Sequence, residues 1–560
     1  MYLRISKTKQ KTGVAEYVQL VQSVRHPETG VPRAQVIHHF GRRDQLDLAV
    51  LRRLIKNIAR FLDDDETAAT TGEGSPFEFV GARAMGATWL LDALWKRLEI
   101  DQELQKLLTK RDFSTPIERL LFAMVANRAL APSSKLAMED WVAKDVVIPG
   151  LEAVSSDQLY RAMDFLLEAD AEIQKAVFFN VANLLNLEVD VIFLDTTSTY
   201  FEVENPDDPE DPKLHLRRRG KSKDNHPELP QVVVGFAITR EGIPVRCWTW
   251  AGNTNDQTVI DEVKRDLNGW KLGRVITVAD TGFNSAENRR KLQTAGGHYI
   301  LCEKLRTGPK GLPVDVLSRA GRFKNLDDDL EIKEVIVDPE GAGKRRFVVV
   351  RNPDEARRDK AKRGDILAEV RRRLDALKEL NGEPHAKAEC ALRSHETFGR
   401  YVAQTPKGRL TLNREKIAQE ELLDGKYLIS SSDDSLSAED VVRGYKALWR
   451  IERAFRDLKH GLDIRPVYHR LSDRIRAHVL LCWLALLLVR VAENESKQTW
   501  RTLRAEMGRL KVGIHQTPHG EIWQTGRLTP AQQAAYQSLQ LDPPPKNYLI
   551  PTPRVASSDL

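Results

Sequence analysis

Cysteines are few in this sequence, and no two of them form a close pair. The 560 residues include only Cys247, Cys302, Cys390 and Cys482, which lie far apart along the chain. Structural zinc sites and disulfide-rich folds need closely spaced cysteines, so the sequence argues against both. Isolated thiols favour a reducing compartment, and we expect the protein to be cytoplasmic.

Long hydrophobic runs are also absent. The first residues, MYLRISKTKQKTG, are polar and basic and lack the apolar stretch of a secretory signal. The most apolar segment, HVLLCWLALLLVR at 478–490, is shorter than the ~20 residues that span a bilayer. It predicts a buried helix, and we expect no membrane partner.

The sequence also lacks a strong excess of either positive or negative charge. The formal net charge is +6 at pH 7, with 30% charged and 41% hydrophobic residues. So mild a charge permits a nucleic-acid partner without requiring one. The densest basic cluster is 344–364, together with Arg371 to Arg373. Such a run is usually a solvated face, so a DNA-tracking role is one of two interpretations that stay open.

The residue pattern changes several times along the chain. Alternating segments at 1–47 predict strands, followed by a helix at 48–62 and a linker at 63–76. Residues 82–187 have helical periodicity throughout. Nothing in the spacing shows whether this helical part contains a helix-turn-helix for DNA-end recognition.

Strand-like segments dominate from residue 189 onwards. VDVIFLD, QVVVGFAIT, IPVRCWTWAG, RVITVAD and HYILCEK are rich in β-branched residues, and a helix at 284–296 separates the last two. We expect an amphipathic helix at 364–380, a strand at 425–432 and one long helix at 437–462. This order predicts an α/β fold with a mixed sheet flanked by helices.

These expectations divide the chain into six parts. Residues 1–75 form a β-rich N-terminal unit with a helix and a linker, which could contact DNA, and residues 76–186 form a helical domain for DNA-end recognition or dimerisation. An α/β core follows in two parts, 187–305 and 425–492, with a basic insertion domain between them at 306–424. The last part, 493–560, is a helical, proline-rich tail.

Two of the predicted strands share the same ending. VIFLDTTST and VITVADTGFNS each run from apolar residues into an aspartate, Asp195 or Asp280. If the strands are neighbours, two carboxylates meet at the rim of the sheet, where a proton or a metal ion must neutralise them. Oxygen ligands suit Mg²⁺ or Mn²⁺. Each aspartate could instead simply end its strand or cap a helix.

The helix predicted at 437–462 carries a third acid. Glu452, Phe455, Arg456 and Lys459 follow helical spacing and share one face. Further basic residues lie close by in the sequence: Arg450, Arg453 and Arg465. On an ordinary surface Glu452 would pair with Arg456, which contributes only about 0.3–0.5 kcal/mol. Alternatively, Glu452 completes a metal site among cations that hold phosphates.

Several of these segments, taken in order, strongly resemble the DDE transposases of bacterial insertion sequences. They are LDTTSTYFE, GKSKDNHPELPQVVVGF, GIPVRCWTWAGNTND, VITVADTGFNS and YKALWRIERAFRDLK. The chain is similar to the group with a Tyr–Arg–Glu–Lys signature, whose tyrosine and lysine each lie seven positions from the glutamate. Tyr445, Glu452 and Lys459 fit that spacing, whereas the signature arginine falls on Leu448, with Arg450 the nearest substitute.

The resemblance implies an RNase H-like core interrupted by an insertion. It implies that Asp195, Asp280 and Glu452 are the catalytic residues and hold two Mg²⁺ ions, with Mn²⁺ as a substitute. Such ions activate water or a DNA 3′-hydroxyl for phosphoryl transfer. The implied partners are double-stranded DNA, both element ends and target, and a second copy of the chain in a synaptic complex. No small-molecule substrate is implied.

The candidate DNA-binding residues form three groups. They are Tyr445, Arg450, Arg456, Lys459 and Arg465 around the glutamate helix, Lys221, Lys223 and His226 in the loop LRRRGKSKDNHPELP, and Arg345 and Arg346 in the insertion. The loop could equally be a mobile, charge-balanced segment. Asn253 and Asp256 match family positions, and for them we favour support of the active-site turn.

We therefore expect a transposase that binds terminal inverted repeats and cuts and rejoins DNA strands. Some relatives stack a flipped base on a tryptophan of the insertion, but residues 306–424 contain no tryptophan. The excision route therefore stays open. A nuclease without strand transfer would have the same acids, and a domesticated, non-catalytic DNA-binding protein would not need them.

Overall fold

The computed structural model describes residues 2–10, 13–25, 32–42, 46, 78–109, 115–187, 190–270, 275–306, 312–327, 329–338, 344–517 and 520–549. The helix predicted at 48–62, the linker at 63–76 and the end of the tail lie outside these ranges. The chain divides into two compact units. One contains Met1–Gly81 with Ile514–Trp523 and Leu549–Leu560, and the other contains Ala82–Gly513 with Gln524–Tyr548.

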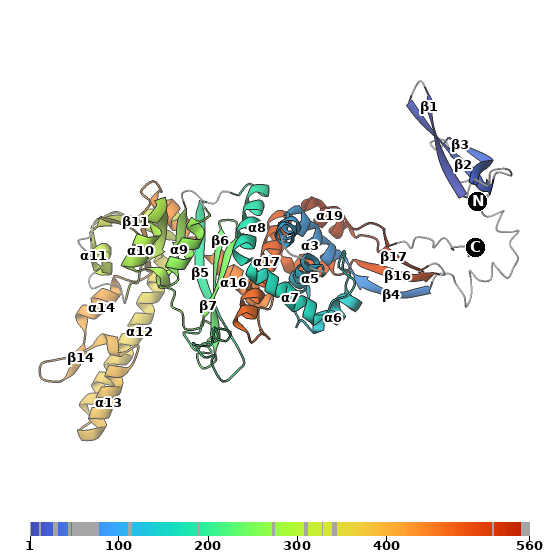
Figure 1. Ribbon diagram of the computed structural model, residues 1–560. Helices are drawn as coiled ribbons and strands as arrows, with labels where there is room; N and C mark the ends of the chain where they lie inside the picture. Colours follow the sequence, from blue (N-terminus) through green and yellow to red (C-terminus); the bar gives the residue numbers. More distant parts are fainter. Residues whose placement is uncertain are drawn as a thin grey trace. The chain divides into compact units, whose positions relative to one another are not determined.

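The N-terminal strands predicted at 1–47 are present. They form an antiparallel sheet in the order β1-β2-β3 (Figure 1), in which Ile5 lies opposite Val18. Their bounds are Tyr2–Gln10, Gly13–Arg25 and Pro32–Arg42.

Four other short strands were not predicted as a sheet. In the order β18-β17-β16-β4 they comprise Asn547–Leu549, Gly520–Thr525, Lys511–Thr517 and Glu78–Ala84. The tail was expected to be helical and proline-rich, yet three of these strands belong to it.

Helices surround the long apolar helix α17 (Ser472–Ser496) in the larger unit (Figure 1). Both α5 and α7 pack against it. The others in this part are α3 (Gly86–Arg97), α4 (Ile100–Leu108), α5 (Ile117–Leu130), α6 (Ala137–Asp140) with a π-turn at Trp141–Asp145, α7 (Ser156–Glu168), α8 (Asp170–Leu184), α18 (Trp500–Met507) and α19 (Pro530–Ser538). Because α5 is buried along almost its whole length, it offers no free face to a DNA groove.

The sequence predicted α17 as a buried helix but underestimated its length. With 25 residues and an apolar composition it is long enough to cross a membrane, and 94% of its most apolar stretch is buried inside the protein. Arg474, Arg476 and Glu493 lie near its ends and extend it beyond the apolar run. It is the core helix of the unit.

The predicted mixed sheet is confirmed and has nine strands. Their order is β10-β11-β12-β15-β9-β8-β5-β6-β7. Five form the first part of the core: β5 (Val191–Tyr200), β6 (Gln231–Thr239), β7 (Pro244–Ala251), β8 (Ile276–Ala279) and β9 (His298–Cys302). β5, β6 and β7 are antiparallel, whereas β8 is parallel to both β5 and β9.

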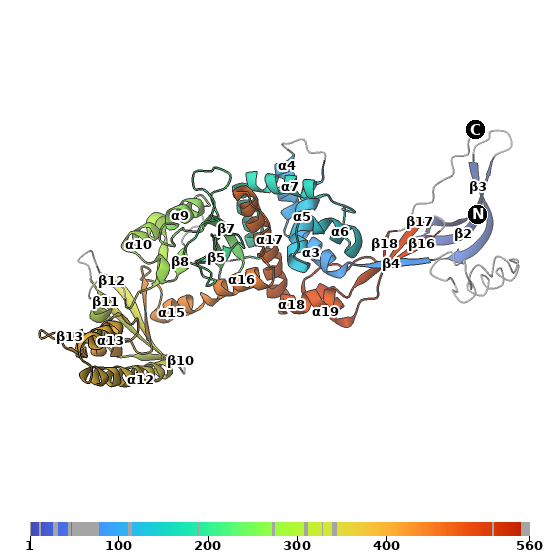
Figure 2. The ribbon, with the colours of Figure 1, turned by 90° about the horizontal axis from the view of Figure 1, so that it is seen from below.

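Helices cover both faces of this sheet, as Figure 2 shows. On one face α9 (Ile260–Asn268) and α10 (Ala286–Leu292) pack over Ile192 and Leu194 of β5. On the other, Val191 and Phe193 belong to the core that includes α16 and α17. Alternating residues of β5 therefore serve two separate cores, which explains why its apolar run is unbroken.

The segment predicted as an insertion, 306–424, joins the sheet at its far edge. The chain passes through α11 (Leu312–Ser318) and the strands β10 (Lys324–Asp327), β11 (Leu330–Val337) and β12 (Arg345–Arg351). β12 pairs with β15 (Lys426–Ser431), which pairs with β9. Outside the sheet lie α12 (Pro353–Lys378), α13 (Gly382–Ser394), β13 (Val402–Gln404), β14 (Leu410–Leu412) and α14 (Arg414–Glu421).

The helix predicted as one segment at 437–462 is in fact two. α15 covers Ala438–Lys446, with its N-cap Ser437 bonded to the Asp440 amide, and α16 covers Trp449–His460. Between them the backbone tightens, since the Leu448 amide donates to the Tyr445 carbonyl rather than one residue further back. The break allows α15 to pack on β9 and β15 while α16 packs on β5 and β6.

Candidate active site

Asp195 and Asp280 lie side by side on neighbouring parallel strands. Leu194 of β5 is in register with Ala279, the last residue of β8; the next residue along β5 is Asp195, and the residue that follows β8 is Asp280. The prediction that the two strands bring their acids together agrees with this register. The prediction that β5 ends at Asp195 is wrong: the strand continues to Tyr200, because the hydroxyl row after Asp195 still pairs with β6.

The Asp195 carboxyl group sits in a poorly hydrated place. Burial raises its pKa to about 6, and the nearby charges of Asp256 and Asp280 act in the same direction. The Lys223 ammonium and a hydrogen bond from the Thr196 amide act the other way. Even with Lys223 close by, this carboxyl group ionises less readily than an exposed aspartate, and a further cation would favour its ionised form.

Asp256 links Lys223 and Thr196 to the turn that follows Asp280. The Thr196 hydroxyl donates to Asp256 Oδ1 at 2.5 Å, and Lys223 Nζ lies 3.4 Å from Oδ2 and 3.8 Å from Asp195 Oδ1. A Cβ at Gly282 would be only 2.9 Å from Asp256 Oδ2, so glycine is required there for close approach. We call Asp195, Asp256 and Asp280 the aspartate cluster.

Tyr445 belongs to this site in a way that sequence reasoning did not assign. It was predicted to contact DNA, but its hydroxyl donates to Asp280 Oδ1 at 3.1 Å. Burial, the neighbouring Cys302 and the Asp280 charge all raise the pKa of Tyr445, so the phenol keeps its proton. It can therefore orient Asp280 as a hydrogen-bond donor.

Glu452 lies on α16, which packs on the same face of the sheet as Asp195. Phe455, one turn further along, stacks on Phe236 with ring centres 5.4 Å apart, and Phe236 is the cross-strand neighbour of Asp195. The Glu452 side chain is exposed and pairs with no described residue, so the surface pair with Arg456 does not form. In the described part of the chain, no three acidic, histidine or cysteine side chains are grouped closely enough to hold a metal ion.

Two candidate DNA-binding cations, Lys459 and Arg465, already bind an acid of the protein. Asp224 accepts from Lys459 Nζ at 2.7 Å and from Arg465 at 3.2 Å. Asp224 follows Lys223 directly, so the basic loop is tied to α16 beside the aspartate cluster. The sequence did not single out Asp224, and no local pattern would have marked it.

The remaining candidate DNA-binding residues differ in exposure and in their contacts. Lys221 is exposed, and His226 bonds Glu228 at 3.0 Å with its ring 4.5 Å from that of Tyr200. Arg456 is exposed on α16. Arg450 lies over Trp449 and lines a separate cavity of about 670 Å³ that includes the start of β5.

Arg345 and Arg346, predicted as DNA contacts, are both held in ion pairs of the protein. Both lie in β12 within the sheet, where Arg345 is paired with Glu303 and Arg346 with Glu334 at 2.8 Å. Arg346 is buried and Arg345 half-buried, because both lie in a strand with acidic neighbours, which the charge run alone does not reveal.

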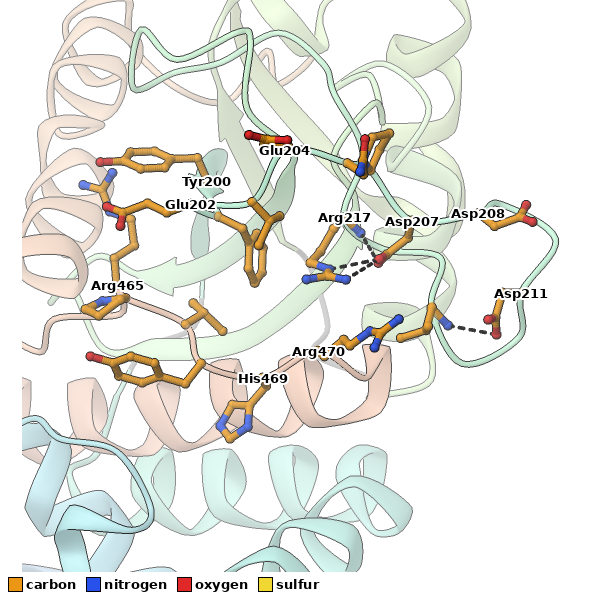
Figure 3. Close-up of a pocket in the computed structure, with 18 of the residues that line it drawn as sticks. Tyr200, Glu202, Glu204, Asp207, Asp208, Asp211, Arg217, Arg465, His469 and Arg470 are labelled. Atoms are coloured by element: carbon orange, nitrogen blue, oxygen red, sulfur yellow. Dashed lines mark hydrogen bonds and ion pairs between the residues drawn. The ribbon is translucent and has the colours of Figure 1, made fainter.

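A groove of about 1070 Å³ lies beyond the end of β5 (Figure 3). One wall is the acidic loop that carries Glu202, Glu204 and Asp208, held by the ion pair between Asp207 and Arg217. The opposite wall is basic and aromatic, and its residues are Tyr200, Lys459, Arg465, Tyr468, His469 and Arg470. Lys459 and Arg465 also hold Asp224, and the preceding Lys223 lies near Asp195 and Asp256, so one loop connects this wall of the groove to the aspartate cluster.

Two family models match this chain. Residues 236–488 match the transposase DDE domain, and residues 3–70 match the N-terminal domain of IS1634 family transposases. No curated protein matches. Among solved structures, a piggyBac transposase in a synaptic complex with hairpin DNA covers 75% of this chain and 79% of its own, at 9% identity and a TM-score of 0.34.

The matched catalytic domain and the sheet order, three antiparallel strands followed by two parallel ones, define a DDE transposase with an RNase H-like core. With its N-terminal match, the chain belongs to the DDE transposases of insertion sequences. Enzymes of this family cleave DNA, transfer strands and use divalent metal ions. The carboxylate oxygens of the aspartate cluster are the donors that such ions prefer.

Proposed function

We propose that Asp195, Asp280 and Glu452 are the catalytic acids and hold two Mg²⁺ ions, which Mn²⁺ can replace. The observation that carries this proposal is the adjacency of Asp195 and Asp280 at the same level of parallel strands. Burial is the main reason that the pKa of Asp195 is raised, and the charges of Asp256 and Asp280 add to it; divalent cations would offset both effects. When bound, these ions would activate water or a 3′-hydroxyl and stabilise the leaving oxygen.

The chain's own residues prepare this site. Tyr445 orients Asp280, while Lys223 partly neutralises Asp195 and Asp256 before a metal ion arrives. Glu452 pairs with none of the residues that the structure describes, and its helix is anchored next to Asp195 through Phe455 and Phe236. A cation between the aspartates would attract its carboxylate.

We further propose that the substrate is double-stranded DNA at the terminal inverted repeats of the element, followed by a target duplex. Two copies of the chain would join the two ends in one synaptic complex, in the cytoplasm on the nucleoid. Lys221, Lys223, His226, Arg456, Lys459 and Arg465 would contact the DNA. The groove beyond β5 would take the strand as it leaves the aspartate cluster.

The decisive experiment is strand transfer with purified protein, Mg²⁺ and DNA that carries the inverted repeats. Wild type is compared with Glu452→Gln and with the control Glu439→Gln, an exposed acid in the first turn of α15. Joined products in wild type and the control, but not in Glu452→Gln, are expected. Free ends without joining would indicate a nuclease, and binding without cleavage by any variant would indicate a non-catalytic protein.

A further inference from the structure

One buried asparagine of α10, Asn288, joins the loop of Asp256 to the turn that follows Asp280. It is only 2% exposed, and its side-chain amide donates two hydrogen bonds of 3.0 Å. One is accepted by the carbonyl of Gln257, the residue after Asp256. The other is accepted by the carbonyl of Phe283, which ends the short turn after Asp280. The amide therefore holds the backbone beside one acid against the backbone beside the other.

A second buried asparagine holds the same turn from the side of β9. The side-chain amide of Asn284 donates to the Cys302 carbonyl, at the end of β9, at 2.8 Å. Its Oδ1 accepts from Arg289 at 2.7 Å, and both side chains are buried. Because β9 is the neighbour of β8 in the sheet, the turn after Asp280 is tied to the next strand as well as to the Asp256 loop.

The turn and the Asp256 loop are in direct contact. A Cβ at Gly282 would lie 2.9 Å from Asp256 Oδ2, so the turn passes against that carboxylate. The other oxygen, Oδ1, accepts from the Thr196 hydroxyl of β5. A loosened turn would therefore change the position of Asp280 relative to Asp256 and to β5. Groups that hold a metal ion must stay within about 0.5 Å of the productive geometry.

The helix itself does not account for an asparagine at position 288. Asn288 is the third residue of α10, where its backbone amide already donates to the N-cap Ser285. Asparagine is disfavoured inside helices because its side chain competes for backbone groups. An amide nitrogen offers two donors on one atom, which a carboxylate or an apolar side chain cannot do. The two carbonyls that it bridges are therefore the reason for this residue.

We propose that Asn288 is a positioning residue for the metal-dependent reaction, because its bridge between the two loops sets the separation of Asp256 and Asp280 before a metal ion binds. This inference rests on the proposed metal site. Loss of the bridge should weaken metal binding by about 10–100-fold, as is typical of residues that support metal ligands. Metal-free DNA binding should not change, since Asn288 is buried and offers no group to DNA.

The test is thermal unfolding of the full chain at increasing Mg²⁺ concentration and constant ionic strength. Bound metal raises the melting temperature, and the Mg²⁺ concentration at half of the rise reports affinity without catalysis. Asn288→Leu has the same branched shape but donates no hydrogen bond, so this concentration should increase about 10–100-fold. Asn288→Ser, which supplies a single donor, should show a smaller increase and serves if the leucine variant does not fold.

The matched control is another fully buried asparagine, Asn127 of α5, whose amide donates to the Ala131 carbonyl at 2.8 Å. Asn127→Leu should lower the melting temperature at every Mg²⁺ concentration without changing the half-maximal concentration. An equal increase in this control would show that general destabilisation is the cause and would overturn the inference. So would a wild-type half-maximal concentration in Asn288→Leu or Asn288→Ser, or a loss of metal-free DNA affinity in either.

Asp195→Asn separates these outcomes from a failure of the proposed function. If Mg²⁺ raises the melting temperature of wild type but not of Asp195→Asn, the proposed metal site is present, and the Asn288 variants alone decide the inference. If Mg²⁺ has the same effect on wild type and Asp195→Asn, or no effect on either, the proposed metal site is wrong and so is the role of Asn288.

Discussion

Ionisation of Asp195 lowers the free energy of unfolding of the metal-free protein. Its pKa rises from an ordinary value of 3.8 to about 6, chiefly through burial. Since the folded state holds this proton more tightly than the unfolded state, stability decreases as pH rises from about 4 to 6. Above pH 6 the whole loss of folding stability caused by ionised Asp195 is present.

Replacing Asp195 by asparagine should therefore stabilise the metal-free protein at pH 8. We expect a gain of about 3 kcal/mol in the free energy of unfolding, given ~1.4 kcal/mol per pKa unit and a rise of about two units that already includes the Lys223 attraction. The gain should shrink below pH 6 and vanish below pH 4, as urea denaturation can measure. Mg²⁺ should stabilise wild type but not the variant. An equal effect of Mg²⁺ on both would show that Asp195 does not hold the metal.

Asp256 should act as a positioning residue. Asp256→Asn keeps the size of the side chain but removes the charge that faces Lys223, so we expect a 10–100-fold loss of strand transfer, typical of residues that support metal ligands. The loss should be partly recovered at high Mg²⁺ concentration, which is measured as a shift in the metal concentration for half-maximal activity. A loss that no metal concentration recovers would assign Asp256 a more direct role.

The sequence could indicate these residues only in part. A strand followed by an aspartate marked Asp195 and Asp280, helical spacing placed Glu452 among basic residues, and the resemblance to the family signature marked Tyr445 and Glu452. The bond from Thr196 to Asp256 joins residues 60 positions apart, and no periodicity encodes such a contact. The role of Tyr445 was missed for the same reason.

Among the secondary-structure elements, α16 determines where Glu452 lies. Its anchor is Phe455, which is 6% exposed and stacks on Phe236. Phe455→Ala should lower the free energy of unfolding by about 3 kcal/mol and also reduce strand transfer in the surviving folded protein. Phe455→Leu should cost less on both counts. Full activity of the folded alanine variant would show that this contact does not position Glu452.

The loop carrying Asp224 restrains two cations that DNA could use. Asp224→Asn should free Lys459 and Arg465, so we expect tighter DNA binding and a slope of log K against log[salt] steeper by roughly 1 to 2. Asp190→Asn, which removes a surface pair with Arg240, is the matched control. An unchanged slope would mean that neither cation contacts phosphate.

Periodicity predicted most of the strands, but not the ends of the elements around the site. β5 continues past Asp195 because Thr196 to Tyr200 are themselves good strand residues. The break between α15 and α16 follows from packing on different strands, and a continuous apolar pattern does not reveal it. Likewise, charge alone could not distinguish Arg345 and Arg346 in the sheet from arginines on the surface.

At the scale of the whole molecule, the two matched domains point to separate parts of the chain for recognition of the inverted repeats and for catalysis. Residues 3–70 match a separate N-terminal domain, whereas every proposed catalytic acid lies in the larger unit. Deleting residues 2–75 should therefore abolish preference for the inverted repeats, measured by competition with unrelated DNA. Metal-dependent nicking should persist and still require Asp195. Retained preference for the repeats would move end recognition into the larger unit.

Between β9 and β15 the chain runs through the edge strands β10, β11 and β12 and the helices outside the sheet, and Glu452 comes only after β15. During synthesis on the ribosome, Asp195 and Asp280 emerge and can pair long before the glutamate helix exists. A nascent or prematurely terminated chain is therefore incomplete at its proposed catalytic centre. If Glu452 is a catalytic acid, as proposed, cleavage can begin only after α16 has been synthesised.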